Sequence, residues 1–272
     1  MSTTHIPLGG MALPNGVLVH GPRHWACAVR TAEGELKVAS GEKPLKAADA
    51  GNRFARAPLR IAEIFPLLAE VRRRLPEAVL PFQRPAVAGA MAGSVVALRA
   101  LRRTRLSPLA RESLGALLSL GPALVALRGS SLAEYHGAEH ISIGSYEHGE
   151  PRTREHERCG SHLVGPLLAT TAVGSALAAR APQRLRPAAR MAAGLGAVAA
   201  SVEVFTWMVA NERHPVARAL ARPGHELQQR VVTAEPSEEQ LEVAGAAVTE
   251  CLRLESGVDG GGDQAPEEAP PA

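Results

Sequence analysis

A short polar segment holds most of the residues that could carry out chemistry. Tyr135 to His162 (YHGAEHISIGSYEHGEPRTREHERCGSH) contains five of the ten histidines, several glutamates and one of the three cysteines. Imidazole, thiolate and carboxylate groups are the usual protein ligands of zinc and related divalent metals. We therefore expect the chemistry of the chain to lie in this segment and the rest to serve as its frame.

The motif HGAEH places two histidines at a spacing suited to metal binding. His136 and His140 are four residues apart, so on a helix both imidazoles project from one face, with Glu139 beside them. The pattern fits the H-x-x-E-H arrangement of inverted zinc peptidases, in which the glutamate acts as general base on a zinc-bound water. The motif is short, and surface side chains on an exposed helix could show the same spacing.

A catalytic zinc ion also needs a third protein ligand and an open coordination position. The loop expected after the motif offers further donors: Glu147, His148, His156, Cys159 and His162. A thiolate is a strong ligand near neutral pH once the metal is present. We predict that Cys159 or His156 completes the site, and that Glu139 or Glu147 transfers protons.

Two other interpretations of this segment stay open. Three glutamates could form ion pairs with neighbouring arginines, namely Glu150, Glu155 and Glu157 with Arg152, Arg154 and Arg158. His148 and His162 could simply be solvated loop residues. Cys159 could instead act as a nucleophile beside a histidine, although no third group that would orient such a pair can be identified.

One carboxylate lies in the most apolar segment of the chain, SVEVFTWMVA. Glu203 would be costly to bury in a membrane or a core unless it were paired, which makes it a candidate functional residue. It could complete the metal site or accept a hydrogen bond from a metal-bound histidine. An ion pair with an arginine of another helix would explain it equally well.

The frame around these residues is predicted to be helical. Of the 272 residues, 46% are hydrophobic but only 3% are aromatic, so the apolar mass is mainly Ala, Leu and Val, which suits close helix packing. Four apolar stretches follow one another: Ala86–Leu98, Leu114–Leu127, Leu163–Ala179 and Met191–Ala210. Only the last reaches the roughly 20 residues of a spanning helix. Hydropathy alone therefore also fits a soluble bundle.

The N-terminal part differs from this helical body. Val17–His20, Trp25–Arg30 and Leu36–Ser40 read as short strands with a turn around Gly34, which predicts a small antiparallel β element over residues 9–42. Between Pro58 and Pro76, apolar residues at helical spacing and an arginine cluster predict an amphipathic helix.

The C-terminal part is polar and regular. Ser237 is a suitable N-cap and is followed by acidic residues, so we predict a helix over Glu238–Leu254. The last residues, rich in Gly, Pro and acids, predict disorder. The patterns together suggest four regions: the N-terminal β element in residues 1–57, a helical membrane-associated domain with the His/Glu/Cys site in 58–232, the C-terminal helix in 233–256 and a disordered tail in 257–272.

Charge and cysteine usage narrow the class of protein. The net charge of +3 is carried mainly by scattered arginines. The clusters at Arg72–Arg74 and Arg99–Arg105 flank apolar runs without interleaved aromatic residues, which favours a solvated or lipid-headgroup-facing surface over nucleic-acid binding. Three widely spaced cysteines predict no disulfide framework. The N-terminus lacks the pattern of a signal peptide, so any membrane insertion is expected from internal helices.

Several motifs in order resemble the YqhQ family of bacterial multi-pass membrane proteins, a family of unknown function. They are GGMALPNGVLVHGP, YHGAEH followed by Tyr146 and Glu147, HERCGS at His156–Ser161, the segment around Glu203, and PGHELQQRVVTAEPSEEQLEVA. The resemblance covers most of residues 9–254. It implies a polytopic helical membrane protein and a predicted metal-dependent enzyme without an established reaction.

Two positions depart from the pattern of this family. Ile141 stands where the family often has Lys after HGAEH, which puts a role for a cation at that position in doubt. Ser161 stands where the family often has Thr, and it keeps a hydroxyl group.

The resulting prediction is a mainly α, membrane-embedded helical bundle with a small N-terminal antiparallel β element, located in the cell membrane with the lipid bilayer as its partner. Its metal site, with zinc as the first choice, would use His136, His140 and His156 or Cys159, with Glu203 as a possible addition. Hydrolysis is the generic reaction. The alternatives are a non-enzymatic membrane protein that binds a metal ion or scaffolds a partner, and a soluble helical protein.

Overall fold

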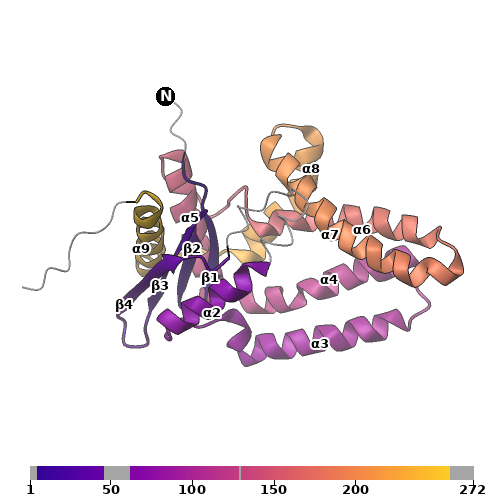
Figure 1. Ribbon diagram of the computed structural model, residues 1–272, viewed down its shortest axis with the longest axis horizontal. Coiled ribbons are helices and arrows are strands. Elements are labelled where there is room, and N and C mark those ends of the chain that lie inside the picture. Colours follow the sequence, from indigo (N-terminus) through magenta and orange to yellow (C-terminus); the bar gives the residue numbers. More distant parts are fainter. Residues whose placement is uncertain (1–4, 46–61, 129, 258–272) are drawn as a thin grey trace, which may run out of the picture.

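The computed structural model describes residues 5–45, 62–128 and 130–257 (Figure 1). Within these ranges it contains eight α-helices and one four-stranded antiparallel sheet, which confirms the mainly helical fold with a small N-terminal β element. The predicted disordered tail lies outside the described residues except for Gly257. The same is true of residues 58–61, at the start of the segment between Pro58 and Pro76.

The sheet is a simple meander in the order β1-β2-β3-β4. Its strands are β1 (Gly9–Leu13), β2 (Gly16–His20), β3 (His24–Arg30) and β4 (Leu36–Glu42). The predicted turn at Gly34 is present, and its φ of 85° is a conformation that glycine adopts without steric cost. The sequence pattern did not predict β1 as a separate strand, because Gly9 and Gly10 weaken the strand signal at its start.

Both faces of the sheet are covered. Helix α2 (Ile64–Arg74) packs on one face, where Trp25, Cys27 and Val29 form a core with Leu67 and Val71. The alternate strand residues point to the other face, where the core contains Val17, Val19, Ala26 and Ala28 together with side chains of α5 and α9. Strand residues of both parities are therefore buried, as expected for a sheet enclosed between helices.

Helices α5 (Ser131–His148) and α9 (Glu238–Glu255) lie against each other and against the sheet. The predicted start of α9 is confirmed as a capping box, in which Ser237 Oγ accepts a hydrogen bond from the Gln240 N–H and Gln240 Oε1 accepts one from the Ser237 N–H. β1 and α9 both contact α5, and Ala138 and Glu139 of the HGAEH motif are buried.

Four helices extend away from the sheet as two hairpins (Figure 1). They are α3 (Pro85–Arg102), α4 (Pro108–Leu127), α6 (Val164–Ala179) and α7 (Arg186–Ala210). Many large apolar side chains on them are exposed, with Val96 at 65%, Met191 at 68% and Leu195 at 71%. Exposed apolar surface on this scale fits contact with a lipid bilayer.

Two segments are long and apolar enough to cross a membrane, Gly160–Ala179 and Gln183–Ala210, with mean hydropathies of 1.4 and 1.5. A third would arise if Ser113–Leu127 and Ser131–His148, which meet at 92°, counted as one bent span. The expectation that only the stretch ending at Ala210 reaches spanning length was wrong. A 3-10 turn at Gly160–Leu163 precedes α6 and extends that helix to 20 residues.

The chain returns from α7 to the sheet through α8 (Pro215–Leu227), a π-helical turn at Gln228–Val232 and α9. Helix α8 packs on α6, α7 and the 3-10 turn at Gly160–Leu163. Residues 228–236 then pass along α5. The part of the chain before the two candidate spans and the part after them therefore meet at the HGAEH motif.

Candidate metal centre

The HGAEH motif is helical, as predicted, and lies in the middle of α5. The imidazole rings of His136 and His140 are neighbours on one face, with centroids 4.4 Å apart. His140 is buried, and this burial lowers its pKa. A neutral imidazole is the form that binds a metal ion, so the site favours the ligand-competent state.

Backbone carbonyls from two separate segments fix both imidazoles. The Nδ1 of His136 lies 2.8 Å from the carbonyl oxygen of Val232, and the Nδ1 of His140 lies 2.6 Å from that of Arg154. A carbonyl oxygen can only accept, so each Nδ1 carries the proton and each Nε2 keeps a free lone pair. This is the arrangement by which outer groups orient metal-binding histidines.

The thiol of Cys159 lies where these lone pairs converge. Its Sγ is 3.7 Å from the Nε2 of His136, and the ligand atoms of His136, His140 and Cys159 all lie within 4.8 Å of one another. Cys159 is 8% exposed. Two imidazoles and one thiolate are a donor set that suits zinc and leave one coordination position open. The group could therefore hold a single metal ion.

Glu139 is buried next to this group, on the side of β1. A side chain at Gly10 would meet its Oε1 at 2.4 Å, so the glycine leaves room for the carboxylate. Its Oε2 has no hydrogen-bond partner among the described residues. Burial raises the pKa of Glu139, while the nearby His136 and His156 oppose the shift. The geometry thus provides a buried carboxyl group that is predisposed to hold a proton.

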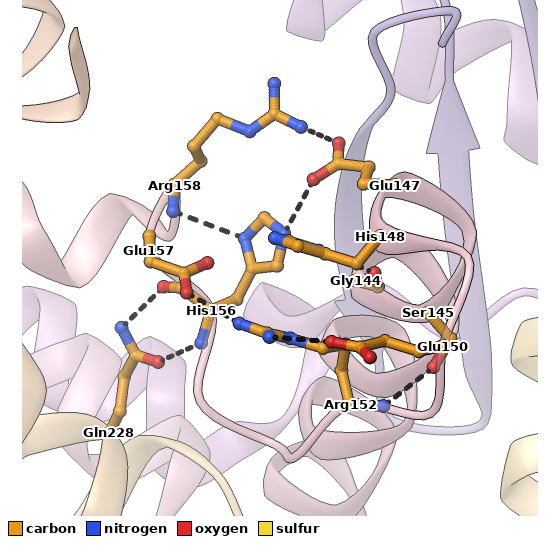
Figure 2. A network of polar contacts seen from close by, with 10 residues as sticks. All are labelled: Gly144, Ser145, Glu147, His148, Glu150, Arg152, His156, Glu157, Arg158 and Gln228. Carbon is orange, nitrogen blue, oxygen red and sulfur yellow. Dashed lines mark hydrogen bonds and ion pairs between the residues drawn. The ribbon is translucent and has the colours of Figure 1, made fainter. Parts of the chain in front are cut away.

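Hydrogen bonds occupy both ring nitrogens of His156 (Figure 2). Its Nε2 donates to Glu147 Oε2 at 3.1 Å, and its Nδ1 accepts from the N–H of Arg158 at 3.3 Å. Glu147 also pairs with the Arg158 guanidinium. The ring of His156 lies 5.5 Å from that of His140, centroid to centroid. His156 is therefore a neighbour of the candidate ligands, and the geometry favours Cys159 as the third one.

Sequence reasoning missed Gln228, which holds the loop that carries His156 and Cys159. This side chain is fully buried, and its Oε1 accepts from the His156 N–H at 2.9 Å (Figure 2). Its Nε2 donates to the carbonyl of His156 at 3.1 Å and to Ser161 Oγ at 2.9 Å. The π-helical turn supplies both this amide and the Val232 carbonyl. Such turns are frequent at functional sites.

The glycine of HGAEH allows a second segment to approach α5. An added Cβ at Gly137 would lie 2.2 Å from the carbonyl oxygen of Ala234. The N–H of Ala234 in turn donates to the carbonyl of Ala133 at 2.9 Å. Gly137 therefore brings residues 232–236, including the Val232 carbonyl, within reach of His136.

The structure places the other predicted residues as follows. Glu147 and His148 belong to the last turn of α5 and not to the loop after it, and His148 is exposed. His162 is buried in the 3-10 turn before α6. Glu203 is exposed on α7 and does not belong to the group of converging ligand atoms. A role of Glu203 at the metal site stays a prediction.

The expected ion pairs form in part. Arg152 pairs with Glu157 at 2.9 Å and with Glu150 at 3.6 Å, and Arg154 reaches Glu155 at 3.9 Å. Beside the site lies a cavity of about 940 Å³, whose lining includes Glu147, His156, Arg158 and His162. His136, His140 and Cys159 are not among its lining residues.

Comparisons with known proteins point to one family. Residues 130–254 match the profile of a family described as "Protein of unknown function (DUF1385)". The uncharacterized protein YqhQ of Bacillus subtilis (strain 168) is 37% identical over 134 residues, which cover 45% of this chain and 41% of that protein. No solved structure matches the chain. Residues 130–254, which carry the whole His136, His140 and Cys159 group, are thus similar to the DUF1385 family and to part of YqhQ.

Proposed function

We propose that this chain is a multi-pass membrane protein with a divalent metal centre, zinc as the first choice, and that the centre catalyses a hydrolysis. The observation that carries the proposal is the fixed orientation of His136 and His140. Each ring donates from Nδ1 to a backbone carbonyl and turns Nε2 toward the region of Cys159. A pair of surface histidines would have no reason to be anchored in this way.

The residues divide naturally into ligands and proton-transfer groups. His136, His140 and Cys159 hold the ion, which would supply a Lewis acid and a bound water of lowered pKa. Glu139 accepts and returns a proton, because its carboxyl group is buried beside His136 and its Oε2 is unpartnered among the described residues. The pair of Glu147 and His156 connects this region to the cavity.

The metal content of the full chain, purified in a mild detergent, tests the ligand set. We expect about one equivalent of metal in the wild type and a loss of at least tenfold in affinity for His136→Ala, His140→Ala and Cys159→Ala. His148→Ala is the matched control, because His148 lies on the same helix but is exposed. A wild type without stoichiometric zinc, manganese or iron would refute the site.

The same measurement decides between the remaining candidate ligands. His156→Gln and Glu203→Gln should retain the metal, because the first residue uses both ring nitrogens elsewhere and the second lies outside the converging group. A loss of metal in either variant would make that residue a ligand after all. Recovery of the chain in the cytosolic fraction without detergent would favour the soluble alternative.

A non-enzymatic metal-binding membrane protein is the second candidate. It is favoured by the position of the three ligand residues, none of which lines the large cavity. Glu139→Gln separates the two functions in a screen of ester, phosphoester and peptide probes. An enzyme should keep its metal in this variant and lose turnover of the probes. For a binding protein, metal content should be unaffected by the substitution, and neither form should turn over a probe. Loss of the metal itself would assign Glu139 to the ligands.

A further inference from the structure

Two walls of the cavity of about 940 Å³ differ in character, beside the part that residues 147–158 line. One wall is apolar and comes from Phe205, Met208 and Val209, in the last turns of α7. These residues lie near the end of the candidate span Gln183–Ala210. The other wall comes from α8, which contributes Arg218 and Arg222, two arginines one helical turn apart.

The charges in the cavity are not all compensated. Glu147 pairs with Arg158 and His156, and Glu157 pairs with Arg152. Glu155, which also lines the cavity, pairs with Arg154 outside the lining. Arg218 and Arg222 are exposed, and neither forms an ion pair with any residue that the structure describes. Glu212 is the opposing carboxylate on the lining of the cavity. After internal pairing, two guanidinium groups therefore face one carboxylate.

The position of the two walls matches the depth profile of a membrane lipid. A helix that crosses the bilayer ends at the level of the headgroups, where alkyl chains give way to phosphates. The apolar wall belongs to the spanning segment, and α8 begins five residues after its last residue. Guanidinium groups bind phosphate through paired, charge-assisted hydrogen bonds.

We propose that this cavity binds a membrane amphiphile that carries a phosphate group, with Arg218 and Arg222 on the phosphate and Phe205, Met208 and Val209 against its alkyl chain. The binding is independent of metal chemistry. The further step, that such a phosphoester is the substrate class of the metal centre, rests on the proposed function. His156 makes the connection, because it lines the cavity and its ring lies 5.5 Å from that of His140.

The test is a titration of the purified full chain, in a neutral detergent, with dihexanoyl phosphatidic acid. Loss of both guanidinium groups in Arg218→Gln/Arg222→Gln should weaken binding by at least about tenfold, because bonds to charged groups contribute that much. Glu212→Gln should bind as tightly as the wild type or more tightly. Arg186→Gln/Arg190→Gln is the matched control, since this pair has the same spacing on α7 and lies outside the cavity.

Two further ligands identify what is recognised. Dihexanoylglycerol lacks the phosphate and should bind at least about tenfold more weakly, while inorganic phosphate lacks the chains and should also bind more weakly. Equal binding of dihexanoylglycerol would overturn the role of the phosphate, and equal binding of inorganic phosphate would overturn the amphiphile. Unchanged affinity in the α8 double variant would overturn the site itself.

Folding and metal loading are controlled separately. Circular dichroism and metal content should be unchanged in the α8 double variant, and Phe205→Gln provides an independent probe of the apolar wall. Cys159→Ala should still bind phosphatidic acid. If the proposed metal centre is wrong, the purified chain should lack metal but still bind phosphatidic acid. If the lipid-binding proposal is wrong, the purified chain should contain metal but show no phosphate-dependent binding.

Discussion

Replacing Gly137 by alanine should destabilise the protein although it improves the helix propensity of α5. In an open helical position the substitution would stabilise by up to about 1 kcal/mol, because alanine loses less backbone entropy on folding. At Gly137 the new Cβ would lie 2.2 Å from the carbonyl oxygen of Ala234. Ordinary van der Waals contact requires a retreat of about 1 Å by residues 232–236.

The expected magnitude follows from the contacts that such a retreat breaks. The hydrogen bonds from Ala234 N–H to the Ala133 carbonyl and from His136 Nδ1 to the Val232 carbonyl are 2.9 and 2.8 Å long. Each contributes about 0.5–1.5 kcal/mol, and overpacking adds about 1–3 kcal/mol. After allowance for helix propensity, we expect Gly137→Ala to lower the free energy of unfolding by about 1–5 kcal/mol.

Gly245→Ala on α9 is the matched control, because a Cβ at that position would meet no atom within 4 Å apart from its chain neighbours and the backbone of its own helix. It should stabilise by about 0.5–1 kcal/mol. Urea unfolding in detergent micelles, followed by circular dichroism, measures both variants against the wild type. Metal affinity should also fall in Gly137→Ala, because the retreat of residues 232–236 moves the Val232 carbonyl away from the imidazole of His136 that it orients. If both glycine variants were equally stable, the close approach at Gly137 would be refuted.

Three further predictions concern buried groups in and around the sheet. Lys43 and Glu63 form a buried ion pair with Nζ and Oε1 2.5 Å apart. Glu63→Gln leaves the lysine charge unpaired and should lower the free energy of unfolding in urea by about 3–5 kcal/mol, whereas Lys43→Met/Glu63→Leu should lower it distinctly less. Equal losses in the two variants would contradict the cost of the unpaired charge. Burial raises the pKa of the Cys27 and Cys251 thiols from 9.0 to about 12, so iodoacetamide at pH 8 should leave both unlabelled in the folded chain, as mass spectrometry can check. Their raised pKa values also predict stability that is complete below pH 9 and is lost between pH 9 and 12, a decline that Cys27→Ala should reduce.

Features encoded over a few residues could be predicted from the sequence. The spacing of His136 and His140 depends only on helical geometry, and the start of α9 depends on the local pair of Ser237 and Gln240. The short apolar runs of β2 and β3 likewise indicate strands from local sequence alone. Each of these patterns is contained within a single element, so no knowledge of the tertiary fold was needed.

Features that join distant segments could not be predicted in the same way. The partner of His136 is the carbonyl of Val232, 96 residues away, and every residue has such a carbonyl. Gln228 has no neighbouring motif that marks it as the anchor of the His156 loop. The exposed position of Glu203 depends on how α7 packs, which the apolar character of its neighbours does not reveal. Pairing between elements, not local pattern, decided these cases.

The hydrogen bond between His136 and Val232 closes a long loop, and this has a consequence for biogenesis. The loop contains both segments that are long enough to cross a membrane. During synthesis, α5 leaves the ribosome well before Val232, and contacts of such high sequence separation form late in folding. The anchor of His136 is therefore completed only after α6, α7 and α8 have been made and placed, whereas that of His140 comes from Arg154, before α6. Metal loading would then report that the helical hairpin has been inserted and that its two ends have met.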